Sequence, residues 1–145
     1  MQCGVVCLRM ICGYHGRDVS MSELGQICSP TTEGVSLLGI SEAAEYFGFH
    51  TLCGRASVDE LRNAPLPCIL HWNQNHFVIL YKVKRNIYYI ADPAKGKVKY
   101  TAKEFVSHWI STQSGGKEKG VAMFLEPTPK FYEQKDDANK ERRSF

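Results

Sequence analysis

The sequence predicts an α+β fold in which N-terminal helices pack on an antiparallel β-sheet. Apolar residues recur at helical spacing up to about residue 47, and short strand-like runs separated by turn residues follow from residue 49 onward. Helices first and strands later are typical of the α+β class. The 145 residues suit one compact domain, because two well-packed cores need a longer chain.

Three helices are expected in the first third of the chain. Ser20 begins the second of them as a cap, with Glu23 three residues later, and Gly48 suits the C-terminal cap of the third. The predicted helices are Cys3 to Tyr14, Ser20 to Ile27 and Ser36 to Phe47.

Strands and two short helices are expected in the rest of the domain. Ser57 with Glu60, and Thr101 with Glu104, form capping boxes that open helices ending near Asn63 and Trp109. A polar loop containing Gly115 and Gly116 follows the second of these helices. The predicted strands are Phe49 to Cys53, Pro67 to Trp72, His76 to Val83, Ile87 to Ala91, Lys97 to Tyr100 and Gly120 to Glu126.

The composition excludes several classes of protein. Hydrophobic residues make up 43% of the chain, as in a globular protein, and the formal net charge of +3 is too small and too scattered to indicate nucleic-acid binding. No apolar run is long enough to span a bilayer, and we expect no signal peptide, because the first residues show no basic region followed by an apolar stretch. The six cysteines form no CxxC pair, and we expect reduced thiols in a cytoplasmic setting.

The chain is expected to divide into a domain over residues 1–129 and a charged tail over residues 130–145. The tail holds five basic and four acidic residues and shows no apolar periodicity. Such a segment has little to bury, which is typical of a solvated linker.

Cys3 is a candidate nucleophile because it begins a predicted helix. The positive end of a helix stabilises a thiolate, and its unpaired backbone N–H groups can face a developing oxyanion. Gly4 would let a substrate backbone approach closely. Read alone, a single cysteine is more often a buried or frayed thiol.

His76 and Asp92 are candidates for the base and for the residue that orients it. His76 begins one predicted strand and Asp92 ends the next, so a hairpin of the two strands would bring both to the same edge. Each residue also has an ordinary interpretation, His76 as a strand-end histidine and Asp92 as the start of a turn. The three residues together indicate more than any one of them.

Three short motifs resemble those of the C39, or bacteriocin-processing, peptidases. Residues 3–11, CGVVCLRMI, are similar to the family's cysteine motif, residues 75–80, NHFVIL, to its histidine motif, and residues 90–93, IADP, to its aspartate motif. The stretches at residues 34–36 and 124–127 also fit. The resemblance extends from Gln2 to about Tyr132.

The resemblance implies a papain-like fold and a catalytic triad of Cys3, His76 and Asp92 that needs no metal or cofactor. It further implies cleavage of leader peptides after a double-glycine motif (Gly-Gly or Gly-Ala) during export of bacteriocin-like peptides. The expected partners are the leader peptide and the membrane and ATPase domains of the same exporter, at the cytoplasmic face of the bacterial inner membrane. The charged tail would lead toward the exporter's membrane domain.

One position departs from the family pattern. The family's oxyanion glutamine stands six residues before the cysteine, a position that would lie before Met1. Gln2 is adjacent to Cys3 and is not expected to replace it. Either the N-terminus is trimmed, or the oxyanion depends on backbone N–H alone, that of Cys3.

Four other interpretations remain open at this stage. The chain could be a non-catalytic C39-like module that binds leaders, or another papain-like hydrolase such as an amidase or a transglutaminase-like enzyme. Cys3 and Cys7, four residues apart on one helix, could form a thiol redox or metal site. Gly115 and Gly116 could indicate self-processing, although no amphipathic leader helix directly precedes them.

Overall fold

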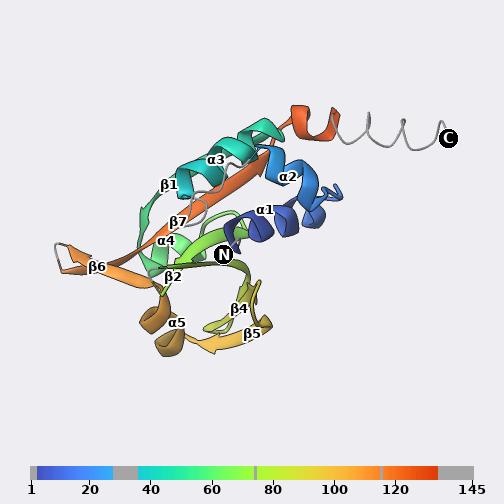
Figure 1. Cartoon of the computed structure of the whole chain (residues 1–145). Coiled ribbons are helices and arrows are strands. Elements are labelled where there is room, and N and C mark those ends of the chain that lie inside the picture. The colour runs from blue at the N-terminus through green and yellow to red at the C-terminus, as the bar shows by residue number, and fades with distance from the viewer. Residues whose placement is uncertain (1–2, 28–35, 74, 115, 134–145) are drawn as a thin grey trace.

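The protein was analysed as a computed structural model, which describes residues 3–27, 36–73, 75–114 and 116–133, without the side chains of residues 3, 112–114 and 117. Helices dominate up to residue 46 and strands dominate afterwards (Figure 1). The helices are α1 (Cys3–Tyr14), α2 (Met21–Ile27), α3 (Leu37–Tyr46), α4 (Val58–Arg62) and α5 (Ala102–Trp109). The strands are β1 (Phe49–Ala56), β2 (Cys68–Trp72), β3 (His76–Lys84), β4 (Ile87–Asp92), β5 (Gly96–Thr101), β6 (Ile110–Ser114) and β7 (Lys117–Pro127).

The strands form one antiparallel sheet that separates two layers of helices. Its order is β1-β7-β2-β3-β4-β5, and β6 pairs with the outer part of β7. Helices α1, α2 and α3 lie together on one side of the sheet, and α5 lies on the other (Figure 1). The predicted α+β class with an antiparallel sheet is confirmed.

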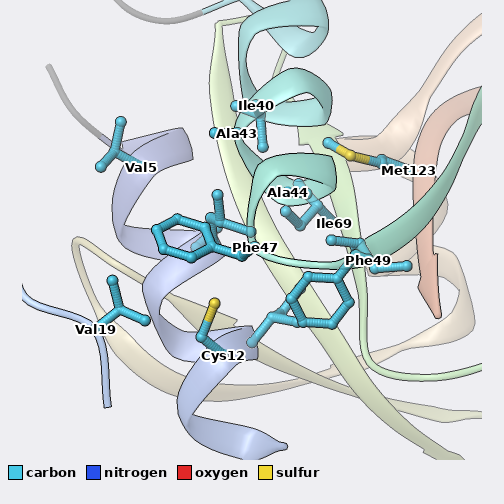
Figure 2. Close-up of a cluster of buried hydrophobic side chains, with 14 of the residues drawn as sticks. Val5, Cys12, Val19, Ile40, Ala43, Ala44, Phe47, Phe49, Ile69 and Met123 are labelled. Carbon is cyan, nitrogen blue, oxygen red and sulfur yellow. The ribbon is translucent and has the colours of Figure 1, made fainter. Parts of the chain in front are cut away.

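The larger core lies between the sheet and the three N-terminal helices. Figure 2 shows Phe47 and Phe49 beside side chains of α1 and α3, with Ile69 and Met123 contributed by the sheet. Burial of these apolar groups is the main favourable contribution to folding.

A second core covers the opposite face of the sheet. Phe105 of α5 stacks on Tyr88 with ring centroids 4.2 Å apart, and Trp72 and Leu80 belong to the same cluster. Because neighbouring residues of a strand point to opposite faces, each central strand supplies side chains to both cores.

The predicted helix starts are present as capping interactions. The Ser20 hydroxyl accepts from the Glu23 N–H at 3.1 Å, and the capping boxes at Ser57 and Thr101 both form. The expected β3–β4 hairpin turns through Arg85 and Asn86, both at positive φ, as a two-residue hairpin loop requires.

The segment after Trp109 differs from its predicted loop. Residues 110–114 form β6, which pairs with the first part of β7, so that β7 begins at Lys117 rather than at Gly120. The sequence Ile-Ser-Thr-Gln-Ser has no apolar alternation to indicate a strand, and its pairing depends on backbone hydrogen bonds. Gly115 lies outside the described residues, and Gly116 adopts a φ of +77° in the turn.

The expectation of little burial after Lys130 is wrong at Phe131. This side chain is fully buried, and its ring centroid lies 4.7 Å from that of Phe49. Gly48, at a φ of +101°, leaves room for it, because a Cβ there would lie 2.3 Å from the Phe131 nitrogen. Phe131 therefore belongs to the folded domain, and a charged tail can begin only after it.

No helix within the described ranges combines the length and apolar character needed to cross a membrane.

Candidate active site

His76 and Asp92 meet at one edge of the sheet. His76 is the first residue of β3 and Asp92 the last residue of β4, and these strands are antiparallel neighbours. The Nε2 atom of His76 lies 2.7 Å from Oδ1 of Asp92. The Asp92 side chain is 3% exposed and that of His76 is 16% exposed, so the pair is largely shielded while the imidazole keeps a path to solvent.

The surroundings of Asp92 keep it ionised. Burial, the largest single influence, raises the pKa of this carboxyl group, but the other influences act in the opposite direction and together prevail. They are the hydrogen bonds from His76 and from the Ala94 N–H, which lies 2.8 Å from Oδ1, and the charge of His76. The net result is a pKa below the ordinary value.

An ionised Asp92 determines how the imidazole is used. A carboxylate only accepts hydrogen bonds, so Nε2 of His76 carries the donated proton. Nδ1 is then the ring nitrogen that can exchange a proton with another group. Two of the predicted site residues are thus in contact in the arrangement that a histidine base needs.

Cys3 is the first residue of α1, and its thiol lies outside what the structure describes. The backbone that follows it lies against the start of β3. A Cβ built on Gly4 would lie 3.3 Å from a ring carbon of Phe77, and the Cys7 thiol lies 3.4 Å from the Phe77 carbonyl oxygen. The N-terminal turn of α1 therefore packs beside the residue that follows His76.

Gly4 is required for packing, whatever its role in substrate approach. A Cβ at this position would lie 2.4 Å from Cδ1 of Ile40 on α3. The space that a side chain would need is already filled by the core. The glycine thus permits α1, α3 and β3 to approach one another.

A pocket of about 250 Å³ adjoins the His76–Asp92 pair. Besides this pair, it is lined by residues from the β2–β3 turn and from the turn after β4: Trp72, Asn73, Asn75, Ala94 and Lys95. Apart from Asn75, which belongs to the histidine motif, none of these residues was predicted to belong to a site. Only the strand pairing, which places the two turns at the same edge, could have indicated it.

His108 of α5 holds one wall of this pocket. Its ring stacks on Trp72 at 5.0 Å, and its Nδ1 lies 2.9 Å from Oδ1 of Asn73. The Asn73 N–H also donates to the His108 carbonyl oxygen at 3.0 Å. His108 thus positions Trp72 and Asn73 at the edge of the pocket.

A second, more apolar hollow of about 230 Å³ lies along α1. Met10 and Tyr14 form its helical side, and both are partly exposed, at 38% and 63%. Its other lining residues are Ile11, Pro67, Ile79, Tyr81, Ala91 and Lys97.

The other described cysteines are poor candidates for chemistry. Cys7, Cys12 and Cys68 are buried thiols outside any disulfide, and burial raises the pKa of Cys12 to about 12. Cys53 is an exposed residue, but partial burial of its thiol group still raises the pKa of that thiol. Within the described residues, no three side chains of the metal-ligating types gather into a site.

The chain matches proteins that process and export peptides. It is 38% identical over 130 residues to the colicin V secretion/processing ATP-binding protein CvaB of Escherichia coli, covering 90% of this chain and 17% of CvaB. It is 32% identical over 135 residues to the lactococcin-G-processing and transport ATP-binding protein LagD of Lactococcus lactis, covering 89% and 18%. The chain thus spans about a sixth of the length of these relatives.

Solved structures show the same fold at similar length. A double glycine motif protease from an AMS/PCAT transporter, solved in complex with the leader peptide, has a TM-score of 0.75 and 31% identity, covering 88% of this chain and 85% of its own. The peptidase domain of Streptococcus ComA has a TM-score of 0.72 and 25% identity, covering 88% and 92%. The papain-like fold expected from the motifs is therefore confirmed. The model of the Peptidase C39 family matches residues 1–114, and the chain belongs to this family.

Proposed function

We propose that this chain is the cysteine peptidase domain of an exporter and that it cleaves leader peptides after a double-glycine motif. The observation that carries the proposal is the His76–Asp92 hydrogen bond beside the first turn of α1, where Cys3 begins the helix. Membership of the Peptidase C39 family supports the reaction class. The names of the relatives support a role in secretion and processing.

In the proposed reaction, Cys3 is the nucleophile and His76 the base. His76 takes the thiol proton, and the sulfur attacks the carbonyl carbon of the second glycine. The positive end of α1 stabilises the thiolate, and the backbone N–H of Cys3 donates to the oxyanion. Asp92 orients the imidazole and stabilises its charged form.

The second half of the reaction releases both products. The imidazolium gives its proton to the leaving amine as the C–N bond breaks, leaving the leader as a thioester on Cys3. Water, deprotonated by His76, then hydrolyses the thioester and restores the thiol. A glycine pair is preferred if the channel near the sulfur excludes a Cβ.

The leader itself needs a docking surface away from the glycine pair. We propose that its amphipathic helix binds with its apolar face in the hollow lined by Met10, Tyr14 and Tyr81. Lys97 at the rim of this hollow would favour an acidic residue on the leader.

The rest of the exporter supplies the expected partners. Relatives of this chain are ATP-binding secretion proteins several times its length. We propose that the domain works beside the membrane and ATPase domains of such a protein, at the cytoplasmic face of the bacterial inner membrane. The segment beyond Phe131 would connect it to them.

The decisive experiment is cleavage of a synthetic leader peptide with a Gly-Gly site, followed by mass spectrometry. Cleavage after the second glycine that is lost in Cys3→Ala would support the proposal. Binding of the leader without cleavage, also when the chain carries additional natural sequence upstream of Met1, would instead favour a leader-binding module. Cleavage by Cys3→Ala at the wild-type rate would exclude the mechanism.

A further inference from the structure

The pocket beside His76 lies on the opposite side of the sheet from α1. Phe77 belongs to the core that α1 covers, whereas Trp72, which pairs with His76 across β2 and β3, belongs to the core beneath α5. Directly paired residues of antiparallel strands share a face. His76 therefore shares the pocket side of the sheet with Trp72, at the edge where the start of α1 packs on Phe77 from the other side.

The position of His76 determines where the cargo half of the substrate lies in the proposed reaction. The inference below depends on that reaction. When the peptide bond breaks, the leader half stays on the sulfur, which belongs to α1. The other half departs as an amine and takes its proton from His76. The peptide beyond the scissile bond must therefore run past the imidazole, away from α1.

We propose that the pocket lined by Trp72, Asn73, Asn75, Ala94 and Lys95 binds the first residues of the cargo, directly after the glycine pair. Its volume of about 250 Å³ is below the roughly 300–1,000 Å³ of pockets that enclose a drug-sized ligand. It suits one or two amino-acid residues.

The charges of the pocket determine which residues it favours. The Asp92 side chain is only 3% exposed, and its Oδ1 already accepts from His76 and from the Ala94 N–H, so this carboxylate is largely shielded from a substrate. Lys95 is exposed, and among the described residues no carboxylate forms an ion pair with its ammonium group. The pocket therefore prefers an acidic or small polar cargo residue and disfavours lysine or arginine.

The walls of the pocket are preformed. Asn73 is held by two hydrogen bonds to His108, and Ala94 is held by its bond to the Asp92 carboxylate. A fixed wall loses little conformational entropy when a peptide binds. Selectivity is thus expected in the free enzyme, without rearrangement.

The test compares three leader peptides that differ only in the first residue after Gly-Gly, which is Asp, Ser or Lys. We expect wild-type kcat/KM to be about three- to tenfold higher for the Asp peptide than for the Lys peptide at low salt. Lys95→Met should remove this preference and Lys95→Glu should reverse it. In 1 M salt, where the screening length is about 3 Å, the preference should shrink.

Lys84→Glu is the matched control, because it makes the same charge change at the far end of β3, about 26 Å from His76 at roughly 3.3 Å per residue. It should keep the wild-type preference. An Asp-to-Lys ratio that is the same in Lys95→Glu as in Lys84→Glu would overturn the cargo pocket while leaving the peptidase proposal intact. Failure to cleave any of the three peptides, also when the chain carries additional natural sequence upstream of Met1, would overturn both.

Discussion

The thiol of Cys7 donates to the carbonyl oxygen of Phe77 over 3.4 Å, which joins α1 to the strand that begins with His76. Cys7 stands one helical turn after Cys3, and Phe77 is the residue after His76. The nucleophile and the base of the proposed reaction are thus carried by two elements whose relative position is fixed by a buried contact between their neighbours.

The same interface predicts the effect of filling the space at Gly4. Gly4→Ala places a Cβ 2.4 Å from Cδ1 of Ile40, and overpacking of this kind costs about 1–3 kcal/mol. The new Cβ requires the Ile40 side chain or the start of α1 to shift, and a shift of α1 should lower the rate of leader cleavage as well. Urea unfolding and kcat on a Gly-Gly peptide measure the two effects.

Two further variants make this prediction specific. Ile40→Val removes the clashing Cδ1, so it should recover part of the stability and activity lost in Gly4→Ala. Gly13→Ala lies in the same helix with no atom within 4 Å of the new Cβ, and should stabilise by up to about 1 kcal/mol. Equal destabilisation by the two alanine substitutions would contradict the packing role of Gly4.

The cysteines should differ in their rates of alkylation. If Cys3 forms a thiolate with His76 and the helix terminus, iodoacetamide at pH 6 should modify it first. Cys53 is exposed, but its raised pKa leaves little thiolate at this pH, and Cys7, Cys12 and Cys68 are buried. Peptide mapping by mass spectrometry gives each rate.

His76→Ala is the informative variant for this measurement. It should slow alkylation of Cys3 without changing the rate at Cys53. Equal rates at Cys3 and Cys53 in the wild-type protein would argue against an activated nucleophile.

Local signals in the sequence were sufficient for most of the fold and for one part of the site. Capping residues such as Ser57 and Thr101 mark helix starts through contacts three residues away, so they can be recognised without tertiary information. The His76–Asp92 contact was predictable because a single hairpin brings the two strand ends together. What could not be predicted depends on distant segments.

Phe131 and β6 illustrate what the sequence left hidden. Phe131 lies in a mainly polar and charged segment without apolar periodicity, and its burial depends on Gly48, more than 80 positions earlier. Strand β6 is polar after Ile110, so its side chains do not predict a strand. It forms through backbone pairing with β7, which the sequence of β6 alone does not reveal. Likewise, Lys95 becomes a pocket residue through the pairing of β2, β3 and β4.

Burial of Phe131 predicts where the folded domain can end: a stable domain must include this residue. Phe131→Ala should destabilise the protein by about 3–5 kcal/mol, because it leaves a cavity against Phe49. The neighbouring Tyr132 is 44% exposed, and Tyr132→Ala should have a much smaller effect. A chain ending at residue 133 should keep the wild-type melting temperature, whereas one ending at residue 129 should not.

The hollow along α1 predicts a variant that binds leaders poorly. Met10→Glu places a charge where the apolar face of the leader helix is proposed to dock, and KM should rise about tenfold with kcat unchanged. Leu38→Glu, at a 69% exposed position on α3, is the matched control and should leave KM unchanged. A fall in kcat with constant KM would indicate that Met10 supports the reaction geometry instead.

The lowered pKa of Asp92 predicts how stability depends on acid. A carboxyl group whose pKa is lower in the folded than in the unfolded protein stabilises the fold fully above its unfolded pKa, near 3.9. That contribution is lost as pH falls through the lower folded value. Asp92→Asn should therefore be less stable than wild type at pH 7, with the difference shrinking below about pH 4. Urea unfolding at pH 7, 5, 4 and 3 measures this difference.

His76→Ala removes the main hydrogen-bond donor to Asp92. The pKa of Asp92 should therefore rise, and the acid dependence of stability should weaken as it does in Asp92→Asn. Parallel stability curves for wild type and Asp92→Asn across this range would mean that the His76–Asp92 bond does not favour the ionised carboxylate, and the assignment of Asp92 as the orienting residue would lose its electrostatic basis.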